Sequence, residues 1–139
     1  MRRERGFTYL MLLWWTAISA VVLAALGQQW LLESRRQKEM ELVFRGTQIR
    51  EAIRHFYEQA PDGQPKRFPH DFEELLEDRR GGQVIHHLRR AWLDPMTNRP
   101  WGLIRDGQAI KGVFSTAKGK PLRAPEGVDR YTDWRFEQG

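Results

Sequence analysis

The stretch from Phe7 to Leu26 reads FTYLMLLWWTAISAVVLAAL and contains no charged residue. In a helix these 20 residues, at ~1.5 Å of rise each, match a bilayer hydrocarbon core of ~30 Å. The apolar region of a cleavable secretory signal is shorter, at ~7–15 residues, and ends at a small-residue cleavage site. The uninterrupted run therefore predicts a retained transmembrane helix over residues 7–26.

The helix-compatible sequence continues to about Glu58, because proline is absent and only Gly27 and Gly46 interrupt it. Beyond the span, apolar or small residues recur at spacings of four, three, four and three, which keeps them on one helical face. Residues 27–58 are therefore predicted to extend the same helix as an amphipathic segment, whose apolar stripe the rest of the chain must cover. The stripe consists of Leu42, Gly46, Ile49, Ile53 and Phe56, and the charged residues expected elsewhere around the helix include Glu39, Glu41, Arg45, Arg50, Glu51 and Arg54.

The segment after the long helix begins with a turn signal, Pro61-Asp62-Gly63. Asp71, with Glu74 three residues later, resembles a capping box and predicts a short helix that ends before Gly81-Gly82. The next segment, Gln83 to Leu93, is compatible with either a helix or an extended chain. Its apolar spacing favours the helix.

Strand-like alternation begins at Trp101. The runs 101–105 and 108–114 flank Asp106-Gly107, a dipeptide that accepts the positive φ of a type I′ turn, so a hairpin is predicted. A third strand is expected from Tyr131 to Phe136, after an exposed loop over 115–130. The predicted fold class is α+β, with a long N-terminal helix, transmembrane in its first half and amphipathic in its second, packed on a small antiparallel sheet.

Composition limits the part outside the span to one modest domain. The chain has 139 residues, a net charge of +5 and no cysteine, which excludes a disulfide scaffold, a Cys-zinc site and a thiol nucleophile. Three basic residues precede the span and three follow it, so the positive-inside rule does not decide the orientation. They are Arg2, Arg3 and Arg5 before it, and Arg35, Arg36 and Lys38 after it.

Neither a metal site nor a catalytic centre is expected. The four histidines contain no His-x-x-x-His pair, and adjacent His86 and His87 point in different directions, so surface or packing roles are favoured for all of them, His55 and His70 included. The chain lacks a glycine-rich phosphate loop and a nucleophile motif, so an enzyme is not expected. The carboxylates expected to form a solvated acidic surface on the short helix are Glu73, Glu74, Glu77 and Asp78.

The N-terminal sequence Arg5-Gly6-Phe7-Thr8-Tyr9-Leu10 resembles that of type IV pilins and type II secretion pseudopilins, in which a short basic leader ends in Gly before Phe-Thr and an apolar helix. The resemblance implies that residues 1–6 are a prepilin leader. It also implies that prepilin peptidase cleaves between Gly6 and Phe7 and that the new amino terminus of Phe7 is methylated. The leader would then lie in the cytoplasm and residues 59–139 would form a periplasmic globular α+β part, anchored as a single-pass protein in the bacterial inner membrane.

The globular part resembles that of the major pseudopilins in its hairpin, its Asp94-Pro95 loop and the Phe114-Ser115 strand end, but two departures from the family stand out. Met11 occupies the fifth position after the cleavage point, where the family usually has Glu; a tip-located minor pseudopilin shares this departure. The loop over 115–129 carries two Lys and one Arg against Glu126 and Asp129, so calcium, which major pseudopilins hold in this loop with several Asp side chains, is not expected. No cofactor is expected either.

The resemblance implies a structural subunit of a type II secretion pseudopilus, which exports proteins across the outer membrane, or of a related type IV pilus. Expected partners are prepilin peptidase, other pseudopilins or pilins and the inner-membrane platform, with force supplied by separate ATPases. Subunits are expected to assemble through the apolar helix, including Phe7, Met11, Trp14 and Trp15, with the two tryptophans facing lipid or packing between neighbouring helices. Pairs such as Arg35/Glu39 and Arg50/Glu51 are expected to set the register.

Nucleic-acid binding is not expected. Removal of residues 1–6 leaves 20 basic and 17 acidic residues, a net charge of +3, which is too dilute to indicate a phosphate-binding surface. Arg79-Arg80 and Arg89-Arg90 are better explained by salt bridges or subunit contacts. The alternative function is a membrane-anchored periplasmic binding module whose leader is never cleaved.

Overall fold

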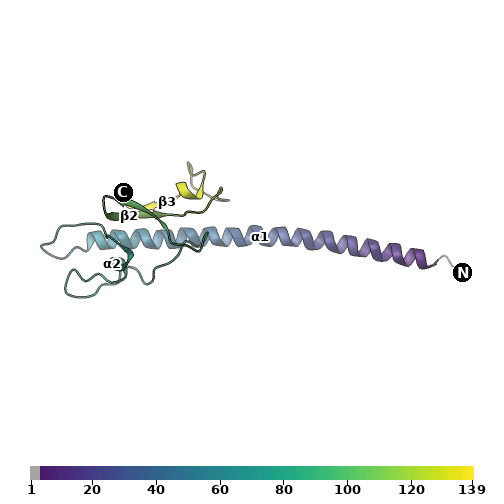
Figure 1. Cartoon of the computed structure of the whole chain (residues 1–139), viewed down its shortest axis with the longest axis horizontal. Coiled ribbons are helices and arrows are strands. Elements are labelled where there is room, and N and C mark those ends of the chain that lie inside the picture. Colours follow the sequence, from purple (N-terminus) through teal and green to yellow (C-terminus); the bar gives the residue numbers. More distant parts are fainter. Residues whose placement is uncertain (1–3) are drawn as a thin grey trace. The chain divides into compact units, whose positions relative to one another are not determined.

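The computed structural model describes residues 4–139, with side chains from Gly6 onward, so residues 1–3 of the predicted leader lie outside the described residues. The chain forms two compact units, Met1–Gln37 and Lys38–Gly139. Helix α1 (Glu4–Glu58) supplies the described residues of the first unit and the long helix of the second (Figure 1). The second unit adds the short helix α2 (Phe72–Leu76), three strands and the 3-10 helix η1 (Tyr131–Asp133). These elements confirm the α+β class.

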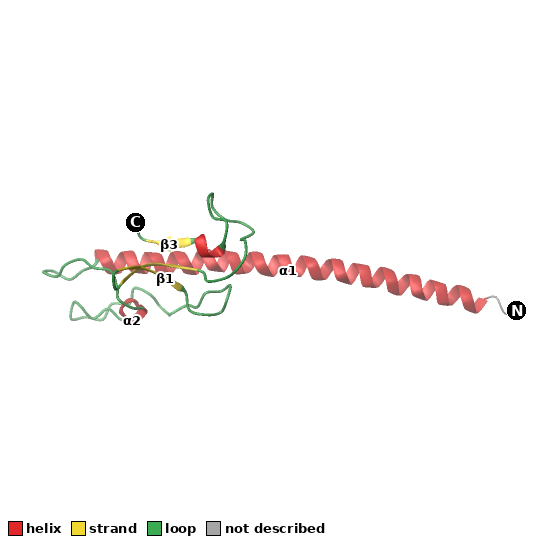
Figure 2. Cartoon of the chain, turned by 45° about the horizontal axis from the view of Figure 1, so that its top comes forward, coloured by secondary structure: helices red, strands yellow, loops and turns green. Residues whose placement is uncertain are grey.

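The strands, which are yellow in Figure 2, form one antiparallel sheet, and its order is β1-β2-β3. Strand β1 (Gly102–Asp106) pairs with β2 (Ala109–Phe114), and β2 pairs with β3 (Arg135–Glu137). Gly107 has a φ of 63° in the turn between β1 and β2, a left-handed conformation that glycine adopts without strain. The predicted hairpin is therefore confirmed, but Asp106 is the last residue of β1 and pairs with Ala109, so the two turn residues are Gly107 and Gln108 rather than Asp106 and Gly107.

The core of the second unit lies between the sheet and the part of α1 that belongs to this unit. The predicted stripe is confirmed, because its four large members are fully buried: Leu42, Ile49, Ile53 and Phe56. Ile110 and Val113 of β2 and Phe136 of β3 bury their side chains in the same cluster. The stripe of the amphipathic segment is thus covered by residues that follow it by more than 50 positions in the sequence.

Gly46 lets α1 approach the sheet closely. A Cβ atom built on Gly46 would lie 2.5 Å from Cδ2 of Phe136, well inside van der Waals contact. The ring of Phe136 itself packs between two indoles, edge-to-face with Trp101 and stacked with Trp134. The small residue in the stripe therefore marks where the last strand docks on the helix.

The short helix α2 begins as predicted. Asp71 is the N-cap, and its Oδ1 accepts a hydrogen bond of 2.9 Å from the backbone N–H of Glu74. The side chain of Glu74 in turn accepts from the backbone N–H of His70 at 2.8 Å. These bonds satisfy backbone donors that the first turn of a helix leaves without partners.

The expected helix from Gln83 to Leu93 is absent from the structure, and that prediction was wrong. Instead, Ile85 and Asp78 exchange backbone hydrogen bonds of 2.8 and 2.9 Å. The backbone N–H groups of His87 and Leu88 both donate to the carbonyl of Leu75. The donors of this segment are thus used by the end of α2 rather than within a helix of their own, so tertiary contacts override the local pattern.

The third strand is shorter than predicted. Tyr131–Asp133 forms η1, and the strand comprises only Arg135–Glu137. The backbone N–H of Trp134 bonds to the carbonyl of Tyr131, which closes the 3-10 turn before the strand begins. The alternation of Trp134 and Phe136 with polar residues correctly predicted a strand in this segment, but not the residue at which it begins.

Candidate functional site

The predicted assembly residues lie on the exposed surface of the first unit. Phe7, Met11, Trp14 and Trp15 expose 64–72% of their surface. The helix is long and apolar enough to cross a membrane, and none of its most apolar 18-residue window is buried in the structure. This uncovered apolar surface is the candidate functional site.

Trp14 and Trp15 belong to different faces of the helix, because successive residues are ~100° apart. Trp15 lines a shallow groove together with Thr8, Met11 and Leu12. A second groove carries Trp14 among aliphatic residues, namely Leu10, Leu13, Ala17, Ile18, Val21 and Val22. The helix therefore exposes bulky aromatic side chains on two faces, so that more than one apolar neighbour can contact it.

Two hydroxyl groups within the apolar run bond to the backbone of the helix itself. The hydroxyl of Thr16 donates to the carbonyl of Leu13 at 2.9 Å, and that of Ser19 donates to the carbonyl of Trp15 at 2.8 Å. Such bonds remove the penalty of placing a hydroxyl in hydrocarbon. Thr16 and Ser19 are thus compatible with lipid or with another apolar helix.

Gly6 of the predicted cleavage site lies in α1 and is exposed. A Cβ atom added to Gly6 would meet nothing within 4 Å, and its φ is not in the left-handed region. The fold therefore places no demand for glycine at this position. A requirement for glycine at position 6 would therefore come from another molecule that binds this segment.

Glu39 lies in the stripe rather than on the solvated side of the helix, so its predicted placement was wrong. Its Oε1 accepts from the backbone N–H of Leu122 at 2.6 Å and from the hydroxyl of Tyr131 at 2.5 Å, and its Oε2 accepts from the backbone N–H of Arg123 at 3.1 Å. The carboxylate is 4% exposed and ties the loop over 115–130 to the first turn of the second unit's helix. It is therefore engaged within its own chain. The expected register pair of Glu39 with Arg35 stays a prediction. The sequence did contain a signal for the buried placement of Glu39, because residue 39 lies three positions before Leu42 and therefore on the same helical face.

Asp78 is also buried, which corrects its assignment to a solvated acidic surface. Arg80 binds it with two charge-assisted hydrogen bonds, from Nη2 at 2.7 Å and from Nε at 2.9 Å, and Nε2 of His87 lies 2.9 Å from Oδ2. The guanidinium of Arg80 stacks 3.5 Å from the ring centroid of Phe56. These bonds, chiefly those from Arg80, hold the pKa of the Asp78 carboxyl well below its usual range, although burial opposes the shift.

Replacing Asp78 by asparagine is expected to weaken the dependence of the second unit's free energy of unfolding on pH in the acid range. The lowered pKa means that the stabilising contribution is complete above the unfolded-state pKa of ~3.9 and is lost as the pH falls toward the folded-state value. Breaking this buried pair is expected to cost ~3 kcal/mol at pH 7, because Arg80 stays buried without its partner. The measurement is the free energy of unfolding of the detergent-solubilised chain between pH 7 and 2. The exposed Asp62→Asn variant is the control, and an equal acid slope in both variants would contradict the assignment.

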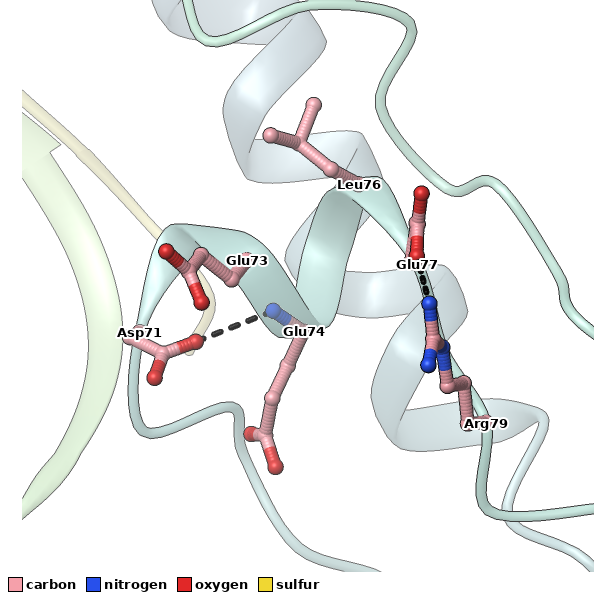
Figure 3. Close-up of a pocket in the computed structure, with 6 residues that line it drawn as sticks. All are labelled: Asp71, Glu73, Glu74, Leu76, Glu77 and Arg79. Carbon is pink, nitrogen blue, oxygen red and sulfur yellow. Dashed lines mark hydrogen bonds and ion pairs between the residues drawn. The ribbon is translucent and has the colours of Figure 1, made fainter.

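The remaining carboxylates of α2 surround a shallow hollow together with Leu76 and Arg79 (Figure 3). Glu77 pairs with Arg79, and Asp71 is the helix cap. Glu74 binds Arg67 through both oxygens, at 2.7 and 2.9 Å, and this pairing lowers its pKa. The cap and the ion pairs thus account for Asp71, Glu74 and Glu77. Among residues 6–139, no group of three or more His, Asp or Glu side chains is placed to hold a metal ion.

The Asp94 carboxylate fastens two loops of the second unit, a role that the sequence did not reveal. It is fully buried and accepts four hydrogen bonds, of which those from the backbone N–H of Met96, at 2.9 Å, and from the hydroxyl of Ser115, at 2.7 Å, are the shortest. An Asp that bonds the backbone two residues later forms an Asx turn, which was the local signal. The bond to Ser115 joins this turn to the end of β2.

Comparisons of the chain with family models, curated proteins and solved structures gave no match. The architecture itself, an apolar N-terminal helix whose continuation packs on a small antiparallel sheet, is consistent with a pilin-like fold. Its distinctive property is a large uncovered apolar surface on one helix.

Proposed function

We propose that the chain is a pseudopilin or minor pilin, a non-enzymatic subunit of a type II secretion pseudopilus or a related type IV pilus. The observation that carries the proposal is the exposed apolar helix of the first unit, joined through α1 to a helix half that carries a small sheet. Such a subunit has its N-terminus in the cytoplasm and its second unit in the periplasm of a bacterium. Its partners are prepilin peptidase, other pilin-type subunits and the inner-membrane platform.

The apolar helix must be covered in the cell. Complete burial of a Leu, Ile, Val or Phe side chain contributes ~1.5–3 kcal/mol, and residues 7–26 carry many such side chains that are 47–72% exposed. Lipid covers this surface in the membrane, and the helices of neighbouring subunits cover it in a filament. Met11 in place of a carboxylate leaves no charged group in the groove that it shares with Thr8, Leu12 and Trp15, so packing by shape and aromatic contact from Phe7, Trp14 and Trp15 drives assembly.

The open surroundings of Gly6 support processing at this position. Glycine here contributes nothing to the packing of the fold, and it weakens a helix by ~1 kcal/mol relative to alanine. A peptidase that binds an extended segment without a side chain explains why glycine occupies position 6. Cleavage between Gly6 and Phe7 removes a charged leader and leaves the apolar anchor intact.

Replacing Gly6 by valine is expected to abolish processing. Mass spectrometry of the wild-type protein from cells with an active prepilin peptidase should show a chain that begins at Phe7 and carries one added methyl group. The Gly6→Val protein should keep its intact amino terminus. Gly27→Val is the matched control, since Gly27 is also exposed in α1 with nothing within 4 Å of an added Cβ, and it should be processed normally.

An intact Met1 in the wild-type protein, or normal processing of Gly6→Val, would contradict the proposed function. Either result would favour an uncleaved, membrane-anchored binding module. Deletion of the gene followed by an assay of exported proteins and of surface pili then separates a secretion subunit from a pilus subunit.

A further inference from the structure

The second unit exposes a row of apolar side chains on α1 that its core does not use. Met40, Val43 and Phe44 are 39–64% exposed. Spacings of three and four residues bring them together on one face of the helix, which is a different face from that of the buried stripe. Apolar residues at such spacings are the anchors with which one helix contacts another apolar segment.

The segment Trp92–Leu93 widens this surface, because the rings of Trp92 and Phe44 lie with their centroids 5.8 Å apart and Leu93 is 40% exposed. Arg45 donates a hydrogen bond of 2.9 Å to the carbonyl of Leu93. Nε1 of the buried Trp101 donates one of 2.9 Å to the carbonyl of Trp92. The surface is therefore already ordered, which lowers the entropic cost of binding. We call this surface the apolar patch and define it by the residues Met40, Val43, Phe44, Trp92 and Leu93.

Three exposed arginines border the apolar patch. The backbone N–H of Trp92 donates to the carbonyl of Arg90 at 3.0 Å, which holds Arg89 and Arg90 beside the patch. The backbone N–H of Asp94, which follows the patch in sequence, donates to the carbonyl of Arg99 at 2.9 Å. Within residues 6–139, none of the three guanidinium groups forms an ion pair. Of the two roles predicted for Arg89-Arg90, contact with another protein therefore remains.

The carboxylates next to the apolar patch do not neutralise these arginines. Glu41, which follows Met40, forms an ion pair with Arg45 at 2.7 Å. Asp94 is fully buried and accepts its hydrogen bonds from backbone N–H groups and hydroxyls. The rim of the patch is therefore cationic, and a surface that carries carboxylates is its electrostatic complement.

A protein fits this surface better than a nucleic acid does. Arginine, tryptophan, phenylalanine and methionine are enriched in protein interfaces. A nucleic-acid strand would need exposed aromatic faces on which its bases stack. Met40, Val43 and Leu93 offer no ring, and the ring of Trp92 is packed against Phe44. The patch thus suits a segment that presents apolar side chains with carboxylates next to them.

We propose that the apolar patch binds an amphipathic, acidic segment of another protein. Apolar side chains of the segment cover the patch, and its carboxylates bind the guanidinium groups of Arg89, Arg90 and Arg99 with charge-assisted hydrogen bonds. All the residues involved belong to the second unit. The inference goes beyond the proposed function, because it requires neither cleavage at Gly6 nor filament assembly.

The test uses the full chain in dodecyl maltoside, an uncharged detergent whose micelle covers the apolar helix of the first unit. A display library of helical peptides is selected in parallel on the wild-type chain and on Phe44→Ser. We expect the peptides recovered only on the wild type to combine aliphatic or aromatic residues at helical spacing with flanking Asp or Glu. A basic or uncharged set, or the absence of any peptide specific to the wild type, would overturn the proposal.

The dissociation constant of the peptide recovered most often, measured by fluorescence anisotropy, tests the apolar side chains. Phe44→Ser is expected to weaken binding by about 30-fold, because a buried aromatic anchor is a typical hot spot. Met40→Ser keeps the contact between Phe44 and Trp92 and should weaken binding by about fivefold. Val84→Ser is the matched control, since Val84 is 49% exposed outside the patch, and it should bind like the wild type. Unchanged affinity in Met40→Ser and Phe44→Ser would contradict the proposal.

A triple variant tests the cationic rim. Arg89→Gln/Arg90→Gln/Arg99→Gln is expected to weaken binding by about tenfold, because each exposed ion pair contributes about twofold. The matched control removes the same charge at exposed positions elsewhere in the unit and should bind like the wild type: Arg123→Gln/Arg130→Gln/Arg135→Gln. Equal weakening in both triple variants would overturn the proposal, because only the net charge of the unit would then matter.

Sedimentation velocity of the detergent-solubilised chain separates the proposed partner from a second copy of the chain. A chain that stays monomeric and binds the peptide supports the proposal. If the wild type instead forms a dimer that Phe44→Ser abolishes, the patch joins two copies and the proposal is wrong. Neither result alters the processing expected at Gly6, so the proposed function is tested by its own experiment.

Discussion

Replacing Gly46 by leucine is expected to prevent the docking of β3 on α1 and to unfold most of the second unit at room temperature. Even an alanine Cβ would lie 2.5–2.7 Å from three ring carbons of Phe136. Gly46→Ala is therefore expected to lose about 1–3 kcal/mol, although alanine favours the helix by ~1 kcal/mol. Leucine adds three more carbons to the clash and is expected to lose more than about 4 kcal/mol, close to the whole stability of a small domain.

The ring of Phe136 cannot easily give way to the new side chain. Its centroid lies 6.3 Å from that of Trp101 and 6.1 Å from that of Trp134, and all three side chains are buried. Displacement of the ring would therefore disturb two further aromatic contacts. The close packing at Gly46 therefore restricts both the side chain at position 46 of the helix and the position of the aromatic cluster around Phe136.

Near-ultraviolet circular dichroism of the detergent-solubilised chain during denaturant unfolding measures this effect, because it reports the packing of Trp101 and Trp134. Gly27→Ala and Gly27→Leu are the matched controls in the same helix, where an added Cβ meets nothing within 4 Å. We expect both to leave the transition unchanged. A Gly46→Ala protein at least as stable as the wild type would show that the contact with Phe136 does not limit the fold.

Replacing Asp94 by alanine is expected to destabilise the second unit by about 3–5 kcal/mol. The carboxylate accepts from the backbone N–H groups of Met96 and Thr116 and from the hydroxyls of Thr97 and Ser115. The hydroxyls can turn to other acceptors, but the two N–H groups would remain without partners. Each buried unsatisfied donor costs about 1–3 kcal/mol, and the lost side-chain volume adds to this.

The same unfolding measurement tests Asp94→Ala. The exposed Asp62→Ala variant is the control and is expected to change stability by less than about 0.5 kcal/mol. Asp94→Asn should lie between the two, since an amide keeps one acceptor oxygen but presents donors to Ser115 and Thr116. A loss in Asp94→Ala no larger than in Asp62→Ala would mean that the two loops hold their positions without the carboxylate.

Features with a local physical signal were predictable from the sequence. The stripe from Leu42 to Phe56 follows from helical periodicity, the β1–β2 hairpin from Asp106-Gly107, and the start of α2 from the side chain of Asp71. Each of these depends on residues within about four positions of one another. The exposed apolar helix was predictable for the same reason.

Features that depend on distant partners were not predictable in this way. Gln83 to Leu93 has helical spacing, but its backbone donors find the carbonyls of Leu75 and Asp78 instead. Glu39 has the residue type of a solvated surface, and only donors more than 80 positions away make its burial favourable. Asp94 meets Ser115 from 21 positions away. Such polar contacts leave no periodic signal in a single sequence.

The closure of the core by its last strand also has a consequence for the order of folding. Glu39 meets Tyr131 across 92 positions, and the contact between Gly46 and Phe136 spans almost as many. Chains with such a high contact order fold slowly, because a long loop must close before its contacts form. The helix stripe is synthesised first and stays uncovered until residues 131–136 have been made. During this interval the strand of another copy can occupy the same place, so newly made chains are most open to strand exchange before β3 has docked.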